Sequence, residues 1–212
     1  ITPMFHVHAW GIPYIATMLG VKQVYPGKYV PANLLKLIAD EGVTFSHCVP
    51  TILAMLLKEP GGEEVSLRKW KCIIGGSALP KSVCLEAMTR GVDVFAGYGM
   101  SETCPVLSIA RLTPQELSAA AEDQVARRVR TGHPIAFVRT RVVDAQGRDL
   151  PMDDRGAGEV VVRAPWLTQC YHKDGANSER LWEGGWLHPP DVAVRDATGS
   201  LRLPARRTDV LT

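Results

Sequence analysis

The sequence predicts an α/β fold: a mostly parallel sheet with flanking helices, followed by a small β-rich subdomain. Two observations carry this prediction. Between residues 21 and 95, short β-like runs alternate with helical runs, and beyond Gly132 only short β-like runs remain, separated by turns. Strands that alternate with helices imply βαβ crossovers and therefore parallel pairing. A chain of 212 residues that is 46% hydrophobic is long enough to bury a core.

In the first part of the chain each helix has recognisable ends. The run PANLLKLIADEG is amphipathic, with Pro31 near its start and Gly42 past its end, and PKSVCLEAMTRG repeats that design. The expected helices therefore cover 31–42, 50–59 and 80–91. The expected strands cover 21–25, 43–49, 71–74 and 92–95.

A further helix is expected after residue 112. Thr113 and Glu116 form a capping box with Pro114 at the first helical position, and the helix should run to about Arg130. The strands of the β-rich part are then expected at 137–144, 158–164, 191–196 and 200–203. We place the domain boundary between residues 131 and 132, which gives one domain over 1–131 and a second over 132–204.

Composition narrows the classes of partner. The formal charge of +2 gives no electrostatic reason to expect a nucleic-acid partner, and the basic run Arg127–Arg130 suits a helix C-terminus. The five cysteines are scattered without a CxxC pair, so neither a zinc site nor a disulfide framework is indicated. We expect reduced thiols in a cytoplasmic protein, and a homodimer stays open.

The first 21 residues carry no charge, and this length could span a bilayer. Pro3, Pro13, His6 and His8 interrupt the run, and no basic segment or small-residue cleavage site accompanies it. We therefore expect a buried core element and no integral membrane segment. The chain opens at Ile1 within apolar sequence, which indicates a fragment.

Two loops follow consecutive expected strands. Gly75–Ala78 reads GGSA, and Gly97–Thr103 reads GYGMSET. In open parallel sheets ligands bind beyond the carboxyl ends of the strands, so two such loops on neighbouring strands converge. Glycines let backbone N–H groups approach an anion, and Ser77, Ser101 and Thr103 add hydroxyls.

The remaining side chains of the second loop suit a nucleotide. Glu102 would repel a bare phosphate but suits a divalent cation that lies between the carboxylate and the phosphates. Tyr98 offers a flat ring for a base. The two loops together predict a nucleotide and Mg²⁺ site, and the alternative is that both are merely tight turns.

These residues resemble the adenylate-forming (AMP-binding) enzymes, which include acyl-CoA synthetases, luciferases and peptide-synthetase adenylation domains. GYGMSET is specific to that family, and the resemblance covers essentially the whole chain. The finer match is to medium- and long-chain fatty acid–CoA ligases. The matching segments, in order, are PMFHVHAWG, VPTIL, IIGGSALP, GYGMSET, TGHP, GEVVVRAPW, GGWLH and RRTDV.

The resemblance implies a role for each matching position. Glu102 would hold Mg²⁺, Thr103 would touch the α-phosphate, and Asp191 would accept hydrogen bonds from the ribose. Arg206 would contact the ribose or phosphates, and His6 matches an acyl-pocket histidine, with a hydrogen-bonded core histidine as its alternative. The implied nucleotide-binding residues are Gly75, Gly76, Ser77, Ala78, Tyr98, Gly99, Met100, Thr103, Asp191 and Arg206; the implied catalytic residues are Thr103, Glu102 and His6.

The implied reaction has two steps. A carboxylate attacks the α-phosphate of ATP to give an acyl-adenylate and pyrophosphate, and coenzyme A then displaces AMP. The family's phosphate loop would lie upstream and its C-terminal domain downstream, with 205–212 as the start of the hinge and Asp209 as the hinge residue. We therefore expect no turnover from this chain alone.

Two positions depart from the family pattern. Pro189 and Pro190 precede Asp191 where the family has Thr-Gly, and Ala205 stands before Arg206 in place of Asp. Proline removes a backbone N–H and fixes φ near −65°, which puts the aim of Asp191 in question. Two alternatives stay open: a non-catalytic acyl- or nucleotide-binding relative, and an amino-acid-activating domain.

Overall fold

The chain folds into two compact units. In this computed structural model the backbone is described for residues 1–206 and side chains for residues 1–204. Unit 1 comprises Ile1–Gly97 and Arg111–Val129, and unit 2 comprises Tyr98–Ala110 and the chain from Arg130 onward. Each unit is described by itself. The α/β sheet with flanking helices and the β-rich part that follows are as predicted, whereas the boundary near Gly132 stays a prediction.

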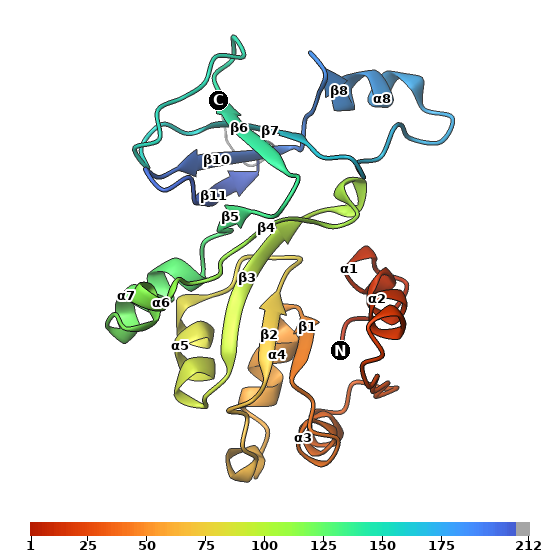
Figure 1. Ribbon diagram of the computed structural model, residues 1–212, viewed down its shortest axis with the longest axis vertical. Helices are drawn as coiled ribbons and strands as arrows, with labels where there is room; N and C mark the ends of the chain where they lie inside the picture. The colour runs from red at the N-terminus through yellow and green to blue at the C-terminus, as the bar shows by residue number, and fades with distance from the viewer. Residues whose placement is uncertain (207–212) are drawn as a thin grey trace. The chain divides into compact units, whose positions relative to one another are not determined.

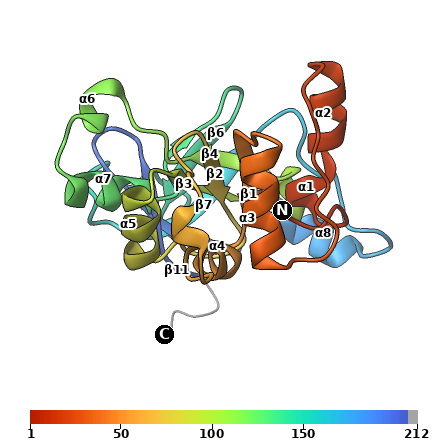
Figure 2. The ribbon, with the colours of Figure 1, turned by 90° about the horizontal axis from the view of Figure 1, so that it is seen from below.

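Unit 1 is built on parallel strands. Strand β1 (Phe45–Cys48) pairs in parallel with β2 (Lys71–Ile74), and β2 pairs in parallel with β3 (Asp93–Gly99). Helices α4 and α5 lie on the same side of these strands (Figure 2). The helices of unit 1 are α1 (Val7–Trp10), α2 (Ile12–Met18), α3 (Pro31–Asp40), α4 (Pro50–Leu57), α5 (Lys81–Thr89), α6 (Pro114–Leu117) and α7 (Ala121–Arg128), with a short 3₁₀ turn, η1 (Gly62–Glu64).

The core of unit 1 follows from the periodicity of its helices. Leu34, Leu35 and Ile38 recur at helical spacing on α3, and all three are buried. Trp70, just before β2, is 1% exposed. These side chains are therefore part of the buried core of unit 1.

Three expectations for unit 1 were wrong. Residues 21–25 form no strand, because no neighbouring described strand satisfies their backbone, and Val21 and Tyr25 are more than half exposed. The first 21 residues are not a buried element: only Ala9 and Ala16 are buried there, and Phe5 is 75% exposed. No helix among the described residues is long and apolar enough to cross a membrane.

The third correction concerns the helix after Thr113. The capping box forms as predicted, with the Glu116 N–H donating to Thr113 and the Thr113 N–H donating to Glu116. The helix ends at Leu117, however, and a second helix, α7, begins at Ala121. The Gln124 amide donates to the carbonyls of Leu117 and Ala119, which satisfies the backbone of the break.

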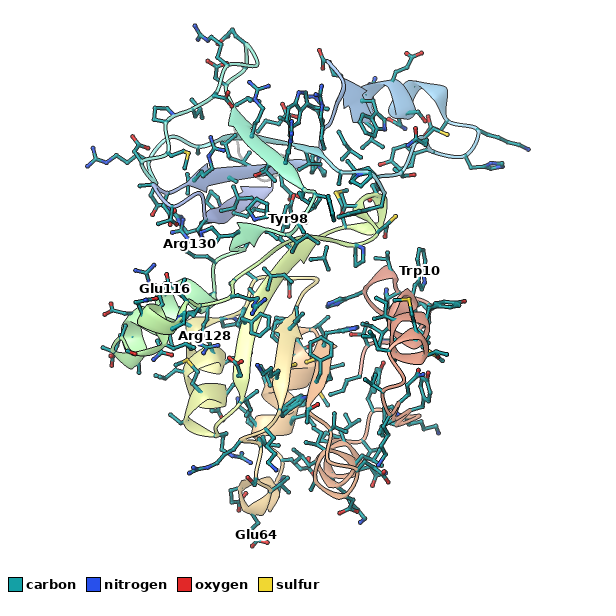
Figure 3. All side chains as sticks on the ribbon, viewed as in Figure 1. Trp10, Glu64, Tyr98, Glu116, Arg128 and Arg130 are labelled. Carbon is teal, nitrogen blue, oxygen red and sulfur yellow. The ribbon has the colours of Figure 1, made fainter. Side chains whose placement is uncertain are left out.

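Arginines of the basic run make specific ion pairs. Arg128 is 5% exposed, and its Nη1 donates to Asp93 Oδ1 at 2.7 Å and to the Val94 carbonyl at 2.8 Å (Figure 3). In unit 2, Arg130 pairs with Asp154 and Asp196. This run therefore stabilises the fold and does not form a free basic patch.

Unit 2 is antiparallel. Strand β4 (Val106–Ile109) pairs with β5 (His133–Pro134) (Figure 1). The second sheet has the order β11-β10-β7-β9-β8, with β6 also paired to β7. Its elements are β6 (Arg139–Val143), β7 (Gly158–Arg163), β8 (Trp182–Glu183), β9 (Trp186–Leu187), β10 (Asp191–Arg195), β11 (Leu201–Arg206), helix α8 (Gly175–Leu181) and a 3₁₀ turn, η2 (Ser101–Thr103).

The core of unit 2 consists of side chains from one face of this sheet and from β4. Val160 and Val162 of β7 face this core, as the two-residue period of a strand predicts, and Val161 between them is buried as well. The buried cluster comprises Leu107, Val138, Val142, Val160, Val162, Leu167, Leu181, Leu187, Ala193 and Leu201, and Tyr98 packs against it.

Position 132 requires glycine for two reasons: its backbone conformation and the lack of space for a side chain. Its φ is +79°, and a Cβ there would lie 2.2 Å from the carbonyl of Ile109. Gly147 has a similar φ of +74° but open space around it. Substitutions at these two glycines therefore distinguish the free-energy cost of a positive φ from the cost of a steric clash.

We predict that Gly132→Ala destabilises the protein by roughly 3 kcal/mol or more, because overpacking adds to the backbone strain. Gly147→Ala should cost only the strain, about 1–2 kcal/mol. Denaturant unfolding of both variants measures the difference. Equal losses of stability would show that the close approach at Gly132 is not a constraint.

His47 is a buried histidine of β1. It is 6% exposed, its Nδ1 lies 3.1 Å from the Thr2 hydroxyl, and its ring stacks on His8 with centroids 4.2 Å apart. Burial, followed by the charge of His8, lowers the pKa of His47 from 6.5 to about 3. His47 is therefore neutral in the fold at physiological pH.

We predict an acid-sensitive stability that depends on His47. Below pH 6.5 the unfolded chain binds a proton that the fold rejects until about pH 3, so the free energy of unfolding falls as pH drops through that window. The slope for one proton is at most about 1.4 kcal/mol per pH unit. In urea unfolding between pH 7.5 and 4.5, His47→Gln should flatten the profile and His172→Gln, at an exposed histidine, should not. Identical slopes for both variants would contradict this assignment.

Candidate nucleotide site

The turn after β3 is closed by its own threonine. Thr103 is fully buried, and its hydroxyl oxygen accepts a hydrogen bond from the Met100 N–H at 2.9 Å and lies within bonding distance of the Pro105 carbonyl. The Met100 N–H also lies 3.2 Å from that carbonyl. Gly99 has to be glycine, because a Cβ there would lie 1.6 Å from the Pro105 oxygen. In this arrangement the Thr103 hydroxyl closes the turn, and its contact with a phosphate stays a prediction.

The turn places Tyr98 against Asp191. The hydroxyl of Tyr98, which is labelled in Figure 3, donates to Asp191 Oδ2 at 2.7 Å, although 93 residues separate the two in sequence. Asp191 is 9% exposed. The bond fixes the orientation of the ring and of the carboxylate together, and a carboxylate has further lone pairs with which to accept other donors.

The prolines before Asp191 do not disrupt its strand. Asp191 is the first residue of β10, so the N–H groups that Pro189 and Pro190 lack lie outside that strand. Pro189 is buried and Pro190 is exposed. In the β10–β11 register Asp191 lies opposite Arg206, so the structure brings these two predicted residues together at backbone level. The Arg206 side chain and Asp209 lie outside the description.

Glu102 has a partner that the sequence did not indicate. The Tyr171 hydroxyl donates to Glu102 Oε1 at 2.8 Å, and the Thr168 N–H donates to the Glu102 carbonyl at 2.9 Å. Burial, followed by the hydrogen bond to Glu102, raises the pKa of Tyr171 to about 12. Tyr171 is therefore a protonated donor at neutral pH, and the carboxylate accepts from it.

The donor set around Glu102 fits Mg²⁺ bound together with a nucleotide. No group of three or more metal-ligating side chains occurs among the described residues. Mg²⁺ commonly keeps several waters and binds through one or two carboxylates plus substrate phosphates, so a single carboxylate is a sufficient protein ligand. These residues therefore do not form a metal site in which every ligand is a protein atom.

A cleft in unit 2 opens beside Glu102. Its volume is about 1530 Å³, and its walls include Met100, Glu102, Tyr171, His188 and Pro190. The Nδ1 of His188 lies 3.2 Å from Glu159 Oε1, so Glu159, in the segment GEVVVRAPW, has a structural partner. The carboxylate predicted to hold the metal is thus accessible from a space large enough for a ligand.

The glycine loop Gly75–Ala78 belongs to unit 1, and its meeting with Tyr98 stays a prediction. Gly75 is buried and Gly76 has a φ of +82°. A Cβ at Gly75 would lie 2.8 Å from the His8 ring. His8 thus shapes this loop, a contact that the sequence did not reveal.

His6 lies at the start of α1. Its side chain is exposed, makes no helix-capping hydrogen bond, and its ring lies 4.5 Å from that of Phe5. The role of His6 in an acyl pocket stays a prediction. Cys104 lies beside the turn after β3, and we expected a small buried thiol there; the structure corrects this, because Cys104 is a free and exposed cysteine.

Comparison with known proteins gives a consistent family. The family model described as AMP-binding enzyme matches residues 1–172. The chain is 38% identical to a long-chain-fatty-acid–CoA ligase of Thermus thermophilus, covering 100% of this chain and 40% of that protein. It is 33% identical to a medium-chain-fatty-acid–CoA ligase of Ectopseudomonas oleovorans, covering 100% and 39%.

Solved structures agree at the level of the fold. The O-succinylbenzoate coenzyme A synthetase of Bacillus subtilis in complex with AMP has a TM-score of 0.82 at 23% identity, covering 99% of this chain and 41% of that one. The N-terminal domain of FACL13 from Mycobacterium tuberculosis also has a TM-score of 0.82 at 23% identity, covering 96% and 49%. The chain thus spans about 40% of the length of the curated relatives it matches. With a matching family model over most of its length and relatives above 30% identity, the chain belongs to the AMP-binding enzyme family.

Proposed function

We propose that these residues are part of an acid–CoA ligase that activates a carboxylic acid with ATP. The observation that carries the proposal is the pair of tyrosine–carboxylate hydrogen bonds, Tyr98 to Asp191 and Tyr171 to Glu102, at one turn. The Tyr98–Asp191 pair suits the nucleoside, and the Tyr171–Glu102 pair suits the metal ion that accompanies the phosphates. The chain spans about 40% of the length of its curated relatives, so the proposal concerns the complete natural protein.

In the first step a substrate carboxylate oxygen attacks the α-phosphorus of ATP, and pyrophosphate leaves. Asp191 would accept hydrogen bonds from the ribose hydroxyls while Tyr98 presents its ring to the base. Mg²⁺, held by Glu102, would neutralise charge on the phosphates. In the second step the thiol of coenzyme A attacks the acyl carbonyl, and AMP leaves.

The proposed acid is apolar, and a fatty acid is the leading candidate. The curated relatives named above are ligases of long- and medium-chain fatty acids. A cavity of about 530 Å³ in unit 1 is lined mostly by apolar side chains, such as Ile12, Leu34 and Phe45, and therefore suits an apolar acid. Another relative, at 33% identity, is a 3-methylmercaptopropionyl-CoA ligase, so the chain length of the acid is for experiment to decide. A cytoplasmic location and a homodimer stay predictions.

We predict acid-dependent ATP–pyrophosphate exchange by the complete natural protein, with fatty acids supporting more exchange than amino acids. Asp191→Ala should lower kcat/KM for ATP by about 10-fold or more, since it removes a charged acceptor. Asp149→Ala is the matched control, because Asp149 is a surface carboxylate paired with Arg141.

No exchange with any acid, from folded protein supplied with Mg²⁺, would contradict the ligase proposal. ATP binding without exchange would favour the non-catalytic binding relative. Exchange with amino acids alone would favour the amino-acid-activating domain.

A further inference from the structure

Glu102 is held from two directions by one segment of unit 2. Thr168 donates its backbone N–H to the Glu102 carbonyl, and Tyr171 donates its hydroxyl to the carboxylate. Only Oε1 of the carboxylate is the recorded acceptor of that hydroxyl, at 2.8 Å. Backbone and side chain of Glu102 are thereby fixed by residues three positions apart.

The segment that holds Glu102 is itself anchored. The Tyr171 N–H donates to the Ser178 hydroxyl at 2.9 Å, and that hydroxyl donates to the Asp174 carbonyl. The Trp182 indole N–H donates to the Thr168 carbonyl at 3.0 Å. Asp174 caps helix α8, so the anchor of Tyr171 is the first turn of a helix. A donor held this way loses little conformational freedom when it bonds to the carboxylate.

This geometry has a consequence for a cation. A hydroxyl that donates to one carboxylate oxygen restricts the rotation of the carboxylate and leaves lone pairs of the other oxygen available to a cation. Outer-shell donors of this kind orient a metal-binding carboxylate, and their loss commonly weakens metal binding 10- to 100-fold. Glu102 and Tyr171 both line the 1530 Å³ cleft, where a nucleotide-bound cation would have room.

We propose that Tyr171 is a positioning residue for Glu102, which orients the carboxylate so that its second oxygen meets the Mg²⁺ bound to ATP. This inference rests on the proposed function. In this proposal Tyr171 acts through its hydrogen bond to Glu102. The expected effect of its loss is therefore on the contribution of Mg²⁺ to ATP binding, while binding of metal-free ATP should be unchanged.

The test is calorimetric titration of the complete natural protein with ATP, once with excess Mg²⁺ and once with EDTA, in the absence of any acid substrate. For the wild type, Mg²⁺ should strengthen ATP binding. For Tyr171→Phe that gain should shrink by about 10-fold, with the affinity in EDTA unchanged. Tyr25→Phe is the matched control, because the Tyr25 hydroxyl also donates to a side chain, Gln23, but at an exposed site of unit 1.

A double-mutant cycle separates positioning from a merely structural role. In a Glu102→Gln background, Tyr171→Phe should cause no further loss of the Mg²⁺ effect, because the two residues act as one unit. An unchanged or larger Mg²⁺ effect in Tyr171→Phe, or equal losses with and without Glu102, would overturn the proposal. If the wild type binds no ATP in either condition, the proposed function fails and this inference with it; if it binds Mg²⁺–ATP and only the variant result is negative, the proposed function survives.

Discussion

The closed turn between Gly99 and Pro105 is the constraint on which the candidate site depends. The Thr103 hydroxyl is fully buried and bonds within the turn, and the close approach of Gly99 to the Pro105 carbonyl leaves no room for a side chain. Because the turn has one tight geometry, Tyr98 just before it and Glu102 within it have fixed directions. Tyr98 reaches Asp191 on β10, and Glu102 reaches Tyr171 beside helix α8.

The two tyrosine–carboxylate pairs have the same type of hydrogen bond. In each pair a neutral hydroxyl donates to a carboxylate, so the negative charge is kept and directed instead of being neutralised. The pKa of Tyr171, raised to about 12, keeps that donor protonated under all physiological conditions. A site that binds ribose hydroxyls or a phosphate-bound cation requires a carboxylate that keeps its negative charge and has a fixed orientation.

Local signals in the sequence predicted the elements that have their own caps and periodicity. Helix α3 and strand β2 follow from Pro31, from the apolar spacing of Leu34 and Ile38, and from the run KCII. Long-range features were not predictable. The hydrogen bond of Tyr171 to Glu102 spans 69 residues, and no periodicity records such a contact. The exposure of Phe5 and the absence of a strand at 21–25 were also missed, because a strand or a buried face needs a partner that composition does not specify.

Binding of the nucleotide by this turn is tested most directly by photo-crosslinking of the complete natural protein with 8-azido-ATP in the presence of Mg²⁺, followed by mapping of the modified peptide by mass spectrometry. Labelling is expected at Tyr98 or within Gly75–Ala78, and it should be competed by unlabelled ATP and reduced in Asp191→Ala. Specific labelling confined to other segments of a folded protein, or labelling that ATP does not compete, would contradict the claim that this turn holds the nucleotide.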